Sequence, residues 1–78
     1  MTEFDNLKRS YIAVIQLSMA ANTPCEEVKR GNDILHRFCD NLVENSCYPD
    51  DEKRRMKNEF DIVKETIAKE IEAFYHQH

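Results

Sequence analysis

Hydrophobic residues recur along this chain at intervals of three and four, which is the repeat of an α-helix with one apolar side. Three segments share the repeat. Their apolar positions are Phe4, Leu7, Tyr11, Val14 and Ile15 in the first; Val28, Gly31, Leu35, Phe38 and Leu42, flanked by Ile34, Cys39 and Val43, in the second; and Met56, Phe60, Val63, Ile67, Ile71 and Phe74 in the third. The spacing predicts three amphipathic helices around one shared core.

Residues that start and stop helices separate the three segments. Thr23 precedes Pro24, and Glu26 follows, which is the order of a threonine N-cap, a proline in the first turn and a capping glutamate. Pro49 disfavours a helical conformation at Tyr48, and three acidic residues then begin the last segment. We therefore expect an all-α, compact antiparallel three-helix bundle, with helices at about residues 3–21, 24–45 and 50–76.

The length supports one small domain that covers residues 1–78. One glycine and two prolines leave little material for long loops, which agrees with a helical chain. A core of this size supplies only about 3–5 kcal/mol, so a partner chain is often needed. The net charge of −4 disfavours nucleic acid as a partner, because phosphate binding depends on clustered Lys and Arg. A protein partner, or a second copy of the chain, is the better expectation.

The three cysteines indicate a reducing compartment, because an odd and sparse set is unusual in secreted proteins of this size. The most apolar stretch, residues 11–21, is too short to span a bilayer and contains Gln16 and Ser18. We expect a cytoplasmic protein that does not contact the membrane.

The sequence shows no pattern typical of an enzyme or a metal centre. Cys25 and His36 are eleven residues apart, about 16 Å along a helix, so they cannot share an ion. His36 and Cys39 could supply two ligands, but no further ligand is evident from the spacing. We therefore predict no catalytic residues, no metal and no cofactor. Cys47, between the second and third helices, is the thiol that we expect to be most exposed.

Oppositely charged residues four positions apart are frequent in all three segments. Such pairs stabilise solvated helix surfaces by about 0.2–0.5 kcal/mol each and need no functional explanation. The predicted pairs are Asp5–Arg9, Glu26–Arg30, Lys29–Asp33, Asp33–Arg37, Asp50–Arg54, Asp51–Arg55, Arg55–Glu59, Lys57–Asp61 and Glu65–Lys69.

Gly31 is unusual because it occupies an apolar position in the middle of a helix, where glycine costs about 1 kcal/mol relative to alanine. Close helix packing, under Tyr11 or Phe60, would explain it. The alternative is room for a small ligand or nucleotide. That pocket would be framed by Tyr11, Lys29, Arg30, Gly31 and Asn32.

Surplus apolar surface on the first helix favours a protein-binding function. Ala13, Leu17, Ala20 and Ala21 lie on the side opposite Tyr11 and Ile15, and Ile62, Thr66 and Ala73 form a weaker strip on the third helix. Apolar surface that one core does not need often marks a protein contact. The sequence therefore predicts a non-catalytic helical protein-binding module, an adaptor, regulator or inhibitor, that forms a homodimer or higher oligomer. The predicted partner-binding residues are Ala13, Leu17, Ala20, Ala21, Ile62 and Ala73.

Overall fold

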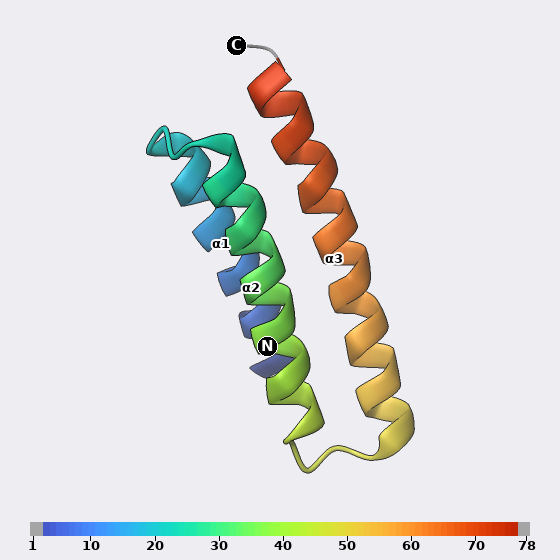
Figure 1. The fold of residues 1–78 in the computed structure, drawn as a ribbon. Coiled ribbons are helices and arrows are strands. Elements are labelled where there is room, and N and C mark those ends of the chain that lie inside the picture. The colour runs from blue at the N-terminus through green and yellow to red at the C-terminus, as the bar shows by residue number, and fades with distance from the viewer. Residues whose placement is uncertain (1–2, 77–78) are drawn as a thin grey trace.

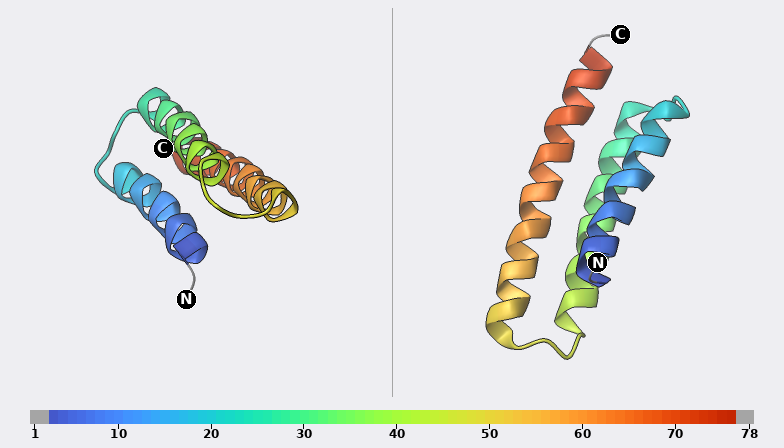
Figure 2. Two further views of the ribbon diagram at one scale, coloured as in Figure 1. Left: turned by 90° about the horizontal axis from the view of Figure 1, so that it is seen from below. Right: turned by 180° about the vertical axis from the view of Figure 1, so that it is seen from behind.

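A computed structural model describes residues 3–76 of the chain. It contains three helices, α1 (Glu3–Ala20), α2 (Cys25–Glu44) and α3 (Asp50–His76), and no strand in the described residues. Figure 1 shows that α2 runs antiparallel to both neighbours, and Figure 2 shows the same bundle from its end and from behind. Each helix packs against the other two, in a molecule of 44 × 18 × 18 Å. The predicted all-α three-helix bundle is confirmed.

The turn between α1 and α2 ends α1 by backbone geometry. Asn22 adopts a left-handed conformation with φ of 61°. The Asn22 N–H donates to the Met19 carbonyl at 3.1 Å, and the Thr23 N–H donates to the Ser18 carbonyl at 3.1 Å. These two bonds form a Schellman motif, in which asparagine takes the place of the more common glycine. The predicted Thr23 cap is wrong: Pro24 is the N-cap residue of α2, and no side chain caps it.

The core lies between the three helices and is centred on aromatic and branched side chains. Phe60 of α3 is fully buried. Its ring meets that of Phe4 edge-on at 5.3 Å and stacks on that of Tyr11 at 6.3 Å between centroids. Such contacts add about 0.5–1.5 kcal/mol beyond the area that they bury. The buried apolar residues are Phe4, Tyr11, Ile15, Met19, Val28, Cys39, Val43, Met56, Phe60, Ile67 and Ile71.

The core-facing side of α2 differs from the predicted one. Phe38, Leu42 and the flanking Ile34 are exposed, whereas Val28, Asn32, Cys39 and Val43 are buried. At 100° per residue, the buried line is rotated by roughly 60° from the predicted stripe, towards α3. The physical reason is that α2 packs against both α1 and α3. The buried side of α2 is therefore the one that points between these two helices. On α1, Val14 was also expected in the core and is instead exposed.

Gly31 does not lie under Tyr11 or Phe60, so the predicted packing contact is wrong. A Cβ atom built at Gly31 would have Ile15 Cδ1 as its nearest neighbour, at 4.0 Å. This distance is an ordinary van der Waals contact, so the α1–α2 packing at this level does not require a glycine.

Candidate functional site

Most of the large apolar side chains that are exposed among the described residues lie on α1 and α2. Val14 and Leu17 of α1, with Ile34, Phe38 and Leu42 of α2, have exposed fractions between 44% and 70%. We call these five residues the apolar face. Large apolar side chains are individually common on protein surfaces, but a contiguous group of them usually marks a contact site.

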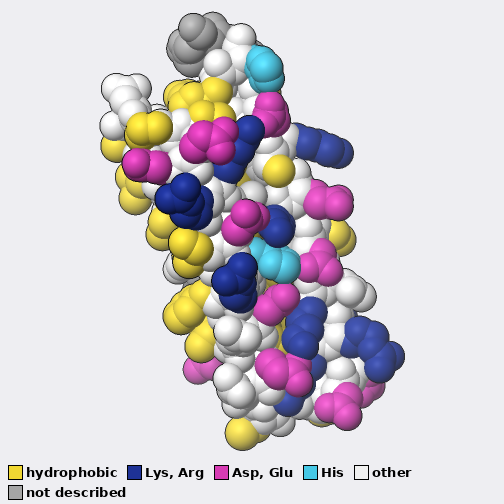
Figure 3. Space-filling model, viewed as in Figure 1, with side chains coloured by type: hydrophobic (Ala, Val, Ile, Leu, Met, Phe, Trp, Pro, Cys, Tyr) yellow, Lys and Arg dark blue, Asp and Glu magenta, His cyan; other side chains and the backbone are white. Residues whose placement is uncertain are grey.

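Helix geometry places the five residues on one side of the molecule. Ile34, Phe38 and Leu42 are spaced by four and therefore form one stripe along α2. This stripe lies on the flank towards α1, because Leu42 lines a groove with Phe4 and Leu7 of that helix. Figure 3, in the orientation of Figure 1, shows hydrophobic side chains along the left edge, over α1 and α2, and charged side chains between α2 and α3.

The predicted partner-binding residues divide between two regions. Leu17 belongs to the apolar face and is its most exposed member. Ile62 lines a separate groove with Ile12 and Val63, between α1 and α3. The four small residues of the prediction, Ala13, Ala20, Ala21 and Ala73, are exposed.

The sequence did not assign the three α2 members of the apolar face to a surface. Their spacing was visible, but Ile34, Phe38 and Leu42 were placed in or beside the core. The buried residues of α2 are instead Val28, Asn32, Cys39 and Val43. Asn32 is polar, so this line does not stand out as an apolar stripe in the sequence.

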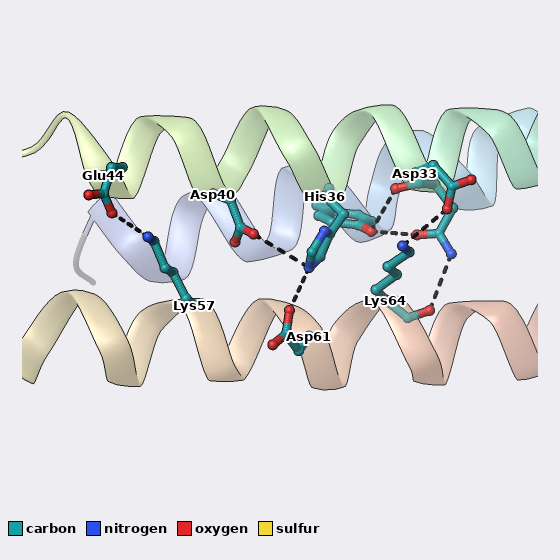
Figure 4. A network of polar contacts seen from close by, with 9 residues as sticks. Asp33, His36, Asp40, Glu44, Lys57, Asp61 and Lys64 are labelled. Carbon is teal, nitrogen blue, oxygen red and sulfur yellow. Dashed lines mark hydrogen bonds and ion pairs between the residues drawn. The ribbon is translucent and has the colours of Figure 1, made fainter.

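The opposite flank of α2 forms a charged seam with α3 (Figure 4). Lys29 pairs with Glu72 at 2.7 Å, Asp33 with Lys64 at 3.2 Å, and Glu44 with Lys57. These contacts between helices replace the predicted pairs of Lys29 with Asp33 and of Lys57 with Asp61. The Arg55–Glu59 pair within α3 is confirmed, at 2.9 Å.

The ion pairs of the seam shift the pKa values of their members in the expected directions. The hydrogen bond from Lys57 lowers the pKa of Glu44, and the same bond raises the pKa of Lys57. Lys29 and Glu72 behave alike: the pKa of Lys29 rises and that of Glu72 falls, in both cases mainly through their shared hydrogen bond. The side chains of all four groups are at least 36% exposed, so the pairs contribute little to stability.

His36 lies at the middle of the seam between two carboxylates. Its Nε2 atom is 2.7 Å from Asp61 Oδ1 on α3 and 3.8 Å from Asp40 Oδ2 on α2. The His36 side chain is 17% exposed. Spacing along the chain could not reveal this contact, because Asp61 is brought to His36 only by the packing of α2 against α3.

The residues predicted for a small ligand are engaged in other contacts. The Tyr11 hydroxyl donates to the Asn32 carbonyl at 3.0 Å and also contacts the Asn32 side-chain oxygen, while Asn32 Nδ2 donates to the Lys64 carbonyl at 3.2 Å. Burial raises the pKa of Tyr11. Gly31 faces α1, whereas Lys29 and Asn32 line a groove on the α3 side of α2, and Arg30 is exposed. The five residues thus do not line one cavity, and ligand binding stays a prediction.

The three thiols differ in exposure. Cys47 is exposed, as predicted, Cys25 is partly buried, and Cys39 is buried in the core. Burial raises the pKa of the Cys39 thiol to about 11, so it remains protonated at neutral pH. A buried, protonated thiol is inert, and Cys39 therefore has the properties of a core residue and not of a nucleophile.

Comparison with known proteins adds no assignment. No protein-family model, no curated protein and no solved structure matches this chain. Within residues 3–76, none of the three helices combines the length and the apolarity needed to cross a membrane.

Proposed function

We propose that the chain is a non-catalytic helical protein-binding module whose binding surface is the apolar face, and that a second copy of the chain occupies this face. The observation that carries the proposal is the exposure of Phe38 and Leu17, at 54% and 70%, on the same flank of the bundle. An adaptor, regulator or inhibitor role towards another protein is the function class that such a module serves.

The dimensions of the molecule support a second copy as the occupant. α1 and α2 are 18 and 20 residues long, so the side that they form measures about 30 × 18 Å, or roughly 540 Å². Two such sides in contact would bury about 1,100 Å² in total, which lies at the small end of the range for specific interfaces. The α1–α2 side therefore offers room for a small dimer interface, and burying it would supplement a core that is small for independent stability.

The arrangement of the two helices supports a symmetric contact. α1 and α2 run antiparallel side by side, so a second copy related by a two-fold axis can lay its own α1–α2 layer on the first. Phe38, the aromatic member of the apolar face, is the type of side chain that contributes most at the centre of interfaces. The charged seam faces away from this contact and would stay in solvent.

Sedimentation velocity on matched variants tests the proposal. Phe38→Glu places a charge on the apolar face and should convert a dimeric wild-type protein to a monomer, with an association constant lowered by at least about 30-fold, as expected for the loss of a central contact worth 2 kcal/mol or more. Circular dichroism should show an unchanged helix content, because Phe38 is not a core residue.

Ile62→Glu is the matched control, since Ile62 is 63% exposed but lies on α3, in the groove towards α1. It should leave the dimer intact. A wild-type chain that sediments as a monomer throughout the micromolar range would contradict the proposal. So would a dimer that Ile62→Glu disrupts and Phe38→Glu does not.

A further inference from the structure

The contact of His36 with two aspartates has the composition and spacing of a metal site. His36 and Asp40 are one turn apart on α2, and Asp61 reaches them from α3. One ligand atom from each residue, the imidazole nitrogen and two carboxylate oxygens, lies within 4.8 Å of the other two. Around a tetrahedral zinc ion with bonds of about 2.0–2.2 Å, ligand atoms are separated by about 3.4 Å. The observed separations are 3.8 Å to Asp40 and 2.7 Å to Asp61. The shorter one is a hydrogen-bond distance, so the Asp61 oxygen would move outward by about 0.7 Å when an ion binds.

Asp40 presents one of its two carboxylate oxygens to the cluster. Oδ2 is the oxygen that lies 3.8 Å from His36 Nε2, and it is the atom that would bind an ion there. The other oxygen, Oδ1, is buried and has no hydrogen-bond partner among the described residues, but it is not the oxygen that faces His36.

The charges around the cluster also favour a cation. The two nearest lysines of the seam are directed to other acids, Lys57 to Glu44 and Lys64 to Asp33. Asp40 and Asp61 instead share the single imidazole of His36 (Figure 4). Two carboxylates beside one imidazole form a donor set that can balance the charge of a divalent ion.

We propose that His36, Asp40 and Asp61 bind one divalent transition-metal ion of the zinc type. Imidazole with two carboxylates suits zinc, and a single nitrogen among the ligands disfavours magnesium and calcium, which take oxygen ligands. Three protein ligands leave the fourth position to water, on the solvent side where Asp61 is 61% exposed. The ion would cross-link the middle of α2 to α3. This site is independent of the apolar face and of the proposed self-association.

Calorimetric titration of the chelator-treated full chain with zinc chloride is the test. We expect one equivalent to bind and the melting temperature to rise with zinc concentration, because the ion binds the folded arrangement only. Cobalt(II) should give the visible spectrum of a tetrahedral site without a sulfur-to-cobalt charge-transfer band. Asp61→Asn and His36→Gln should each weaken zinc binding by at least about tenfold.

The controls separate this site from other metal-binding groups of the chain. His76→Gln removes the imidazole that contacts Glu72 at the end of α3 and should leave zinc binding unchanged. Asp61 is exposed, so Asp61→Asn should fold as the wild type even if His36→Gln does not. The absence of zinc binding, a thiolate band with cobalt, or binding that His76→Gln abolishes and Asp61→Asn does not would overturn the proposal.

Discussion

Tyr11 and Asn32 form a polar contact inside an otherwise apolar core. The Tyr11 hydroxyl donates to the Asn32 backbone carbonyl and contacts the Asn32 side-chain oxygen, and Asn32 Nδ2 donates to the Lys64 carbonyl of α3. One buried amide thus connects all three helices. A satisfied polar group of this kind disfavours other alignments of the helices, since any shift would leave it buried without partners.

At the residue scale, the three cysteines give a prediction for thiol reactivity. A chromogenic disulfide reagent at neutral pH should modify Cys47 of the native protein first and Cys39 only at the rate of unfolding, because Cys39 is buried and protonated. Cys47→Ser should remove the fast phase. Equally fast modification of Cys39 in the native protein would contradict the buried position.

The same thiol contributes a pH dependence to stability. Folding raises the pKa of Cys39 from its ordinary value of 9.0 to about 11, so the folded state favours the protonated thiol. Its contribution is fully present below pH 9.0 and is lost as the pH rises towards 11. The difference in free energy of unfolding between wild type and Cys39→Ala, measured in urea, should shrink over that interval. A constant difference would contradict the shift.

At the scale of the helices, Gly31 offers a stabilising substitution. Gly31→Ala should raise the free energy of unfolding by about 0.5–1 kcal/mol, because alanine restricts the unfolded chain and the added methyl meets only Ile15 at 4.0 Å. Chemical denaturation, at concentrations where both proteins have the same association state, measures the change.

Ala68→Gly, at an exposed position in the middle of α3, is the reverse control and should lower the free energy of unfolding by a similar amount. If Gly31→Ala instead destabilised the protein, α1 and α2 would have to approach more closely than the structure shows.

The helices were predictable because their signals are local. Apolar spacing, Pro24 and Pro49 mark where each helix runs, and the predicted boundaries agree with the structure to within a residue. The buried side of α2 was not predictable in the same way. Two apolar lines share Val28, and which of them is buried depends on where α1 and α3 lie, which spacing along one helix does not determine.

The candidate sites follow the same division. Leu17 was identifiable as surplus because it lies opposite the core side of its own helix. The charged seam was not identifiable from the sequence. Lysines such as Lys29 and Lys57 have acidic residues four positions away on their own helix and also on the facing helix, and spacing does not decide between them. The structure pairs them across the seam, with Glu72 and Glu44. Contacts between helices, including that of His36 with Asp61, arise only from tertiary packing.

At the scale of the whole molecule, two of the three flanks of the bundle are unlike in character. One is the charged seam of α2 with α3, which keeps its ion pairs in solvent. The other is the apolar face of α1 with α2. Its exposed apolar side chains contribute to stability only when another surface covers them and removes them from water. A small domain with one flank of each kind is suited to associate in a single orientation, with the apolar faces in contact and the seams outside.

The central claim is that the apolar face is buried against a second copy, and isotope-filtered NMR on an equal mixture of labelled and unlabelled chains tests it most directly. The account predicts intermolecular NOE cross-peaks from the Phe38 ring and from the methyl groups of Leu17 and Ile34, and none from Ile62. A spectrum without intermolecular cross-peaks at millimolar concentration, or with cross-peaks from Ile62 alone, would contradict it.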